Sequence, residues 1–359
     1  MKTIVAKVNE KNLCEEKSKF IIKQAGEIIR NGGLVAFPTE TVYGLGANAL
    51  DERAAAKVYM AKGRPSDNPL IAHICDTGML DDIVSEVPDI AKKLMEAFWP
   101  GPMTLIFQKS GIVPKGTTGG LDTVAVRYPN HPVACAVIEA AGVSIAAPSA
   151  NLSGKPSPTL GEHVIDDMDG LIDMIIDGGM VGMGLESTII DVTVTPPMIL
   201  RPGFITYEMI KDVIGKVNVD KAIFSKPVDG LKPKAPGMKY RHYAPEADYK
   251  IYRGNADSVA ERIIMSANEK SNNGDKTGII TVDQHLSLYH ERLNKDIIVV
   301  SLGDINRPET IANMLFKVLR DFDKANTKFI FGEAFSENNV GWAIMNRLTK
   351  AAGYNIIDV

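Results

Sequence analysis

The sequence predicts an α/β protein with two domains, and three observations support this class. Short apolar strands alternate with helical patterns along most of the chain. The 359 residues exceed what one compact core usually holds. Four prolines, at 227, 233, 236 and 245, interrupt the alternation and favour an extended connector. We therefore expect an N-terminal domain at 1–212, a connector rich in proline, lysine and glycine at 213–246, and a smaller C-terminal domain at 247–359.

The N-terminal part carries clear signals for helix ends. Asp51 is a suitable N-cap, Pro88 and Pro132 suit a first helical turn, and the glycines at 32 and 33 should stop the first helix. These signals predict helices at 17–31, 52–62, 88–98 and 132–141. Apolar runs predict strands at 34–37, 70–74, 103–108, 123–128, 143–147, 174–177 and 187–192. Several of these strands lie too close in sequence for helical crossovers, so the sheet should be mixed.

The C-terminal part alternates more regularly. The pattern predicts strands at 249–252, 277–282, 296–301 and 327–331, and helices at 256–270, 284–292, 308–325 and 341–352. Such alternation is typical of a small, parallel, doubly wound (Rossmann-like) sheet.

Composition excludes several classes of protein. No apolar run reaches the length of a signal peptide or a membrane span, so we expect a cytoplasmic protein. The three cysteines, Cys14, Cys75 and Cys135, are too scattered for a disulfide framework or a zinc knuckle. Residues 1–210 carry 18 Lys and Arg against 25 Asp and Glu, a net charge of −7. That charge argues against general nucleic-acid binding, although a local basic patch would still be compatible with it.

Polar clusters recur at the ends of the predicted strands. They are PTETVYGLG at 38–46, KGRPSDNP at 62–69, Arg127, PSANLSGKPSPT at 148–159, ESTIID at 186–191 and RPG at 201–203. Ligands of open α/β sheets bind outside strand ends, so these clusters could line one cleft. Lys62, Arg64, Arg127 and Arg201 would then suit a polyanionic ligand with phosphates, because guanidinium groups bind oxyanions bidentately.

Each cluster also has an ordinary structural interpretation. Lys62 could be a solvated helix end, and the SANLSG run could be a set of turns. His73 could be a hydrogen-bonded core residue, and Glu40 and Thr41 could cap a loop. The familiar catalytic motifs are missing: Gly154-Lys155 is followed by proline, which excludes a P-loop, and the six dispersed histidines do not suggest a metal site. The residues alone thus predict a cationic, hydroxyl-rich cleft for a nucleotide-like ligand.

Read in order, the motifs resemble the YrdC-like family. The matching segments are PTETVYGLG, KGRPSDNPL, RYP, APSANLSG, STIID and RPG, and the later PGMKYRHYAP and GWAIMNRLTKAAG resemble its long form with a second α/β domain. The resemblance implies a twisted mixed sheet with a large concave cleft, over which the connector closes. It also implies a nucleotidyltransferase that makes threonylcarbamoyl-adenylate and pyrophosphate from L-threonine, bicarbonate or CO2, and ATP. A separate transferase complex would use this product to form threonylcarbamoyladenosine in tRNA.

The resemblance also implies roles for individual residues. The L-threonine site would comprise Thr41, His73, Arg127, Ser187 and the backbone at Ala147, with Arg127 pairing the carboxylate. The ATP site would comprise Lys62, Arg64, Asn68, Thr123, Ser149, Asn151, Ser157, Arg201 and Tyr243, the last as a lid contact. Lys62 and Arg64 would act catalytically on the phosphates, and His73 is a candidate base. Gly44 and Gly46 would let the backbone turn past the cleft.

ATP implies Mg2+, for which the sequence assigns no ligands; Glu186 and Asp191 are candidates only by their place in the sequence. Two other functions remain open at this stage. One is a non-enzymatic RNA-binding module in tRNA or ribosome maturation, which the charge of −7 disfavours. The other is a carbamoyl transferase of the hydrogenase-maturation type, which should carry cysteine-rich zinc segments that this sequence lacks.

Overall fold

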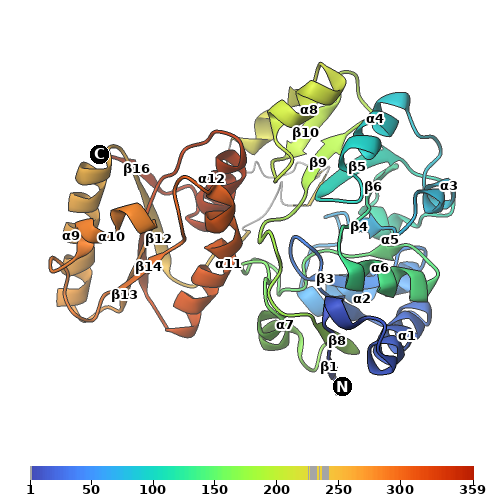
Figure 1. Ribbon diagram of the computed structural model, residues 1–359, viewed down its shortest axis with the longest axis horizontal. Coiled ribbons are helices and arrows are strands. Elements are labelled where there is room, and N and C mark those ends of the chain that lie inside the picture. Colours follow the sequence, from blue (N-terminus) through green and yellow to red (C-terminus); the bar gives the residue numbers. More distant parts are fainter. Residues whose placement is uncertain (1, 225, 227–232, 234, 237–241) are drawn as a thin grey trace. The chain divides into compact units, whose positions relative to one another are not determined.

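The structure is a computed structural model that describes residues 2–224, 226, 233, 235–236 and 242–359 (Figure 1). The chain divides into two compact units. The first comprises Met1–Ser153 and Ser157–Tyr240, and the second comprises Gly154–Pro156 and Arg241–Val359. Part of the predicted connector, 225, 227–232, 234 and 237–241, lies outside the described residues. The domain boundaries drawn from the sequence therefore stay predictions.

The first unit is built on an eleven-stranded mixed sheet, as the strand spacing predicted. Its order is β1 (Ile4–Lys7), β8 (Met174–Asp177), β2 (Val35–Phe37), β3 (Gly44–Asn48), β7 (Ile145–Ala146), β4 (Ile71–His73), β6 (Thr123–Arg127), β5 (Met103–Gln108), β9 (Thr188–Asp191), β10 (Met198–Arg201) and β11 (Asn218–Val219). Strands β4 and β6 run parallel, whereas β5 is antiparallel to β6 and β10 is antiparallel to β9. The prediction missed β1, β3, β10 and β11.

The described part of the first unit contains eight α-helices, of which the sequence predicted four, at 17–31, 52–62, 88–98 and 132–141. They are α1 (Glu16–Arg30), α2 (Glu52–Lys62), α3 (Leu80–Ile83), α4 (Asp89–Phe98), α5 (Lys115–Thr118), α6 (Pro132–Ala141), α7 (Gly161–Met168) and α8 (Tyr207–Ile214). The Asp51 side chain accepts hydrogen bonds from the backbone of Arg53 and Ala54, which confirms it as the N-cap of α2. Helices α1 and α6 approach so closely that a Cβ on Gly26 would lie 2.5 Å from the carbonyl carbon of Ala140.

The second unit contains a five-stranded sheet in which every pair is parallel, as predicted, although the strand at 356–358 was not predicted. Its order is β14 (Ile298–Ser301), β13 (Thr277–Thr281), β15 (Phe329–Glu333), β12 (Asp248–Arg253) and β16 (Ile356–Asp358). The helices are α9 (Ala256–Asn272), α10 (Leu286–Tyr289), α11 (Pro308–Lys324) and α12 (Val340–Ala351). No helix in the described part of the chain is long and apolar enough to cross a membrane.

One predicted helix of the second unit is wrong in extent. The range 284–292 contains only the four-residue α10, after a 3-10 turn at Asp283–His285. Glu291 has φ 58°, a left-handed conformation that cannot continue an α-helix. His285 and Tyr289 both bond to the buried Glu333 carboxylate, which holds this short segment in place.

The glycines of PTETVYGLG also differ from expectation, because Gly44 and Gly46 lie in strand β3 and form no turn. Gly46 is paired with Val35. A Cβ at Gly46 would lie 2.6 Å from a ring carbon of Phe37 and 2.8 Å from a methyl of Ile145. Packing against the sheet, and not backbone freedom, therefore requires glycine there.

Candidate functional site

The strand ends bring part of the expected threonine site together. His73 ends β4 and Arg127 ends β6, and the two are register partners in this parallel pair. Ala147 follows β7, and its N–H donates to the carbonyl of Ile71, which also accepts from His73 Nδ1 at 3.0 Å. Three adjacent strands inside the sheet thus bring His73, Arg127 and the Ala147 backbone near one another; because β7 is antiparallel to β4, Ala147 lies beside Ile71, whose carbonyl also holds the His73 ring.

Thr41 lies in the loop between β2 and β3 and is fully buried. Its hydroxyl is 2.9 Å from the Thr39 hydroxyl, which itself donates to the carbonyl of Val42 at 2.7 Å. A hydroxyl has one proton, so Thr41 is the donor to Thr39. The Thr41 oxygen consequently keeps its acceptor capacity for a ligand.

Arg127 forms a buried ion pair with Glu40. Its Nη2 lies 2.8 Å from Oε1 of Glu40, and the side chains are only 5% and 10% exposed. Within the described part of the chain, Arg127 Nε and Nη2 and both Glu40 oxygens have no partner with hydrogen-bond geometry. Electrostatic attraction therefore holds the pair together, and the N–H donors of Arg127 and the acceptor oxygens of Glu40 can still bind a ligand. The sequence had left Glu40 as a loop or cap residue, because nothing local marks its partner.

His73 is buried, and burial together with the nearby Arg127 guanidinium lowers its pKa to about 3. The imidazole is thus neutral at physiological pH, with Nδ1 donating to Ile71. A group with so low a pKa is a weak base for an ammonium. The low pKa and the bond to Ile71 favour a hydrogen-bonding role for His73 over the role of general base that the resemblance suggested.

Ser187 and Arg201 are joined directly. Arg201 Nε donates to the carbonyl of Ser187 at 3.0 Å, and Nη2 donates to its hydroxyl oxygen at 3.2 Å. The Ser187 hydroxyl also lies 2.7 Å from that of Thr104 on β5. Thr104 was missed by the sequence analysis, since it is an unremarkable residue within an apolar strand.

The two cations of the KGRPSDN segment, Lys62 and Arg64, donate hydrogen bonds to backbone carbonyl groups. Lys62 Nζ donates to the carbonyls of Ser149 and Asn151, each at 2.5 Å. Arg64 donates to the carbonyls of Asn68 and Pro69, at 3.3 and 3.1 Å. Lys62 therefore ties the end of α2 to the SAN loop that the sequence assigned to ATP.

The remaining residues assigned to ATP are spread over both units. Asn68 is 1% exposed, and its Oδ1 has no hydrogen-bond partner among the described residues; Thr123 begins β6 and is half-buried. Ser157 donates to Oε1 of Glu186 at 2.6 Å. Tyr243 belongs to the second unit, with φ 64° and its ring 5.1 Å from that of Phe316. The nucleotide contact expected of Tyr243 stays a prediction.

The described residues contain no group of three or more His, Cys, Asp or Glu side chains that could hold a metal ion. Glu186 accepts from Ser157, and Asp191 accepts from both the backbone N–H and the hydroxyl of Thr193. Neither carboxylate is thus arranged with others as a magnesium cage of the protein's own.

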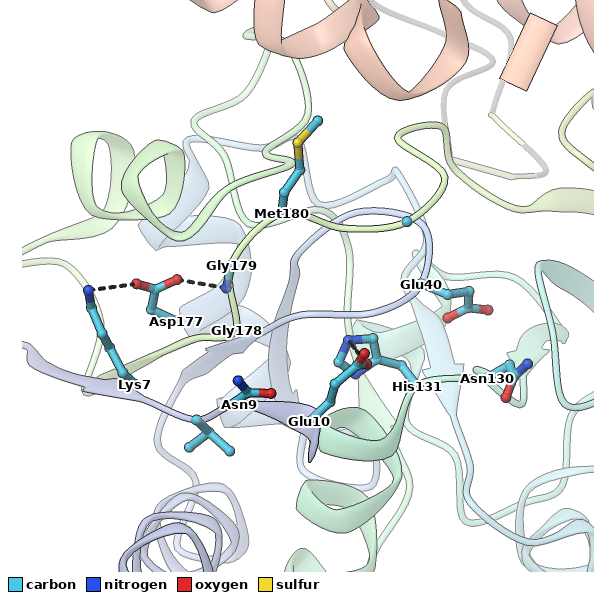
Figure 2. A pocket seen from close by; sticks show the side chains of 12 residues that line it. Lys7, Asn9, Glu10, Glu40, Asn130, His131, Asp177, Gly178, Gly179 and Met180 are labelled. Atoms are coloured by element: carbon cyan, nitrogen blue, oxygen red, sulfur yellow. Dashed lines mark hydrogen bonds and ion pairs between the residues drawn. The ribbon is translucent and has the colours of Figure 1, made fainter. Parts of the chain in front are cut away.

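A pocket of about 520 Å³ opens beside Glu40, the ion-pair partner of Arg127 (Figure 2). Its lining includes Glu10, Glu40, Asp177 and His131, with Lys7 as the only cation among the described Lys and Arg residues that line it. Burial lowers the pKa of His131 below its usual value. Three carboxylates against one lysine make this pocket unsuited to a polyphosphate. The buried cations Lys62, Arg64 and Arg201 match the charge of a polyphosphate better.

Comparison with known proteins agrees with this geometry. A model of the Sua5, YciO and YrdC proteins, described as "Telomere recombination", matches residues 27–203, and one described as "Threonylcarbamoyl-AMP synthase, C-terminal domain" matches residues 205–353. The two matched ranges are therefore those of a YrdC-like enzyme with an appended C-terminal domain.

The individual relatives specify the family further. Threonylcarbamoyl-AMP synthases from Pyrococcus abyssi (strain GE5 / Orsay) and Bacillus subtilis (strain 168) are each 48% identical to this chain. The first match covers 97% of this chain and 98% of the relative, and the second covers 94% of each. A crystal structure of Pyrococcus abyssi Sua5 complexed with L-threonine has a TM-score of 0.91 and 47% identity, covering 99% of this chain and 100% of that one. The chain belongs to the Sua5 family of threonylcarbamoyl-AMP synthases, which confirms the family, fold class and enzyme class predicted from its motifs.

Proposed function

We propose that this chain condenses L-threonine, bicarbonate or CO2, and ATP into threonylcarbamoyl-adenylate and pyrophosphate. The threonine amine adds to CO2 and loses a proton, which gives a carbamate. A carbamate oxygen then attacks the α-phosphorus of ATP, and pyrophosphate leaves. No protein nucleophile is needed, so catalysis depends on positioning the reactants and stabilising charge on the phosphates.

The observation that carries the threonine site is the buried Arg127 guanidinium, whose Nε and Nη2 have no hydrogen-bond partner in the described part of the chain. A buried guanidinium whose Nε has no hydrogen-bond partner among the described residues, and whose Nη2 is held only by charge to Glu40, can bind a carboxylate. We assign the threonine carboxylate to Arg127 and the remaining contacts to Thr41, His73, Ser187 and the backbone of Ala147. His73 is given a hydrogen-bonding role because of its low pKa.

The ATP phosphates are assigned to Lys62, Arg64 and Arg201. Neutral contacts are assigned to the other residues that the motifs indicate, namely Asn68, Thr123, Ser149, Asn151, Ser157 and Tyr243. All three cations are at least 90% buried, so their charge is little screened by solvent. We infer that Mg2+ enters bound to the triphosphate, because the described residues offer no carboxylate cage.

The product would pass to a tRNA threonylcarbamoyl transferase complex, and we infer a cytoplasmic reaction because a tRNA is the final acceptor. A test of the whole proposal is pyrophosphate release from ATP, measured with and without threonine and bicarbonate. Release that needs all three supports the proposal. Release that is independent of threonine refutes it, and so would binding of tRNA without any turnover.

Arg127→Ala and Arg201→Ala separate the two halves of the site. Loss of a charge-assisted contact typically costs about 1.5–3 kcal/mol, or about 10- to 100-fold in affinity. Arg127→Ala should weaken threonine binding by this factor and leave ATP binding within about twofold. Arg201→Ala should weaken ATP binding by this factor; because Arg201 also holds the carbonyl and the hydroxyl of Ser187, threonine binding should fall as well, but by a smaller factor. An equal loss of both ligands in either variant would show that the residue is misassigned.

A further inference from the structure

The loop that carries Ser149, Asn151 and Ser157 contains three residues of the second unit. Gly154–Pro156 belongs to that unit, although the residues on both sides of it belong to the first. Gly154 has φ 94°, which favours glycine. The tripeptide follows Ser149 and Asn151 and directly precedes Ser157. Where the chain places the tripeptide therefore affects the positions of these three residues, all of which are assigned to the nucleotide.

Arg320 on helix α11 holds this tripeptide. Its Nε and Nη2 both donate to the carbonyl oxygen of Pro156, at 3.0 and 2.7 Å. Arg320 is only 6% exposed, and Pro156 is buried. Two donors from one planar, charged group fix the direction of the carbonyl more firmly than a single bond would.

The same face of α11 also holds the end of the connector. Phe316 stacks on Tyr243 with ring centroids 5.1 Å apart, and Asp323 Oδ1 accepts from the backbone N–H of Glu246 at 2.8 Å. Phe316, Arg320 and Asp323 are spaced by four and three residues, which places them on one side of a helix. The N–H of Ala244 donates to the carbonyl of Gly154 at 3.0 Å, which joins the tripeptide to the connector.

We propose that Arg320 is a positioning residue for the nucleotide: by holding Pro156, it fixes the course of the loop that carries Ser149, Asn151 and Ser157. This inference rests on the proposed function, since these three residues were assigned to ATP there. It gives helix α11 of the second unit a specific task in catalysis, beyond stabilising its own sheet. Arg320 touches no substrate in this scheme and acts through the loop.

The test uses the full chain with the Arg320→Ala substitution and steady-state kinetics in each substrate. Loss of both bonds to a buried carbonyl should raise the KM for ATP about tenfold and leave the KM for threonine within about twofold. Hydrogen exchange of the backbone amides at 150–158 should become faster. A merely structural role would lower the melting temperature or the active fraction without this selectivity.

Lys317→Ala is the matched control, because it removes one positive charge from the same helix. Lys317 pairs with Asp321 at 2.6 Å, and it should show wild-type KM values. If Arg320→Ala does not fold, Arg320→Gln takes its place, since an amide cannot reproduce the two-pronged charged contact. An unchanged KM for ATP in a folded Arg320 variant overturns the inference, while wild-type turnover would still support the proposed function.

Discussion

Glu40→Gln removes the charge that balances Arg127 and changes the side-chain volume little. Both side chains are at least 90% buried, and Nη2 and Oε1 are 2.8 Å apart. Removing one member of a buried pair leaves the other charge uncompensated, which typically costs about 3–5 kcal/mol. We therefore expect the free energy of unfolding of the first unit to fall by about this amount. Saturating threonine should restore part of the loss, because its carboxylate would supply the missing negative charge.

Urea unfolding followed by tryptophan fluorescence measures this effect. The two tryptophans, Trp99 and Trp342, lie in different units, so a Trp342→Phe background makes the signal report on the first unit alone. Glu10→Gln is the control, because Glu10 lines the same pocket but its side chain is 50% exposed and lies 3.8 Å from His131. It should cost less than about 1 kcal/mol. A Glu40→Gln variant that is as stable as the control would refute the assignment of a buried, structural charge pair.

Three further results are expected. Gly46→Ala should destabilise the first unit by about 1–3 kcal/mol, because its Cβ would lie 2.6 Å from the Phe37 ring; calorimetry with an unchanged transition would contradict this. His73 should stay neutral between pH 5 and 8, and an imidazole NMR resonance titrating near the ordinary histidine pKa of 6.5 would contradict its pKa of about 3. As the pH falls from about 6.5 towards 3, the His73 imidazole binds a proton in the unfolded chain but not in the folded one, so the free energy of unfolding should fall by at most about 1.4 kcal/mol per pH unit. A His73→Gln variant whose stability has the same pH dependence as wild type would refute this.

Local rules predicted much of the fold. Asp51 and Pro132 mark helix starts through cap chemistry, which depends on nearby residues only. Strand β3 was missed because its sequence, GLGAN, has low strand propensity. It pairs through the backbone with β2 and β7, and its glycines are required by neighbours from distant parts of the sequence. The left-handed Glu291, which shortens the predicted helix at 284–292, likewise has no local signal.

The site was predictable to the extent that its motifs are contiguous. The PTET, KGRPSDN and SAN segments indicate residues with suitable chemistry, but not which of them meet. The Glu40–Arg127 pair joins residues 87 positions apart, and the Arg320–Pro156 contact joins residues 164 positions apart. Such pairs depend on the register of the sheet and on the packing of a helix. They could be found only once the fold was known.

In the proposed reaction, the chain joins three substrates into one adenylate. The most direct measurement is mass spectrometry of the product formed from ATP, L-threonine and 13C-bicarbonate. We expect threonylcarbamoyl-adenylate carrying one 13C atom, released together with one pyrophosphate, and no such product when threonine is left out. Threonyl-adenylate without the label, or ADP and phosphate in place of pyrophosphate, would contradict it.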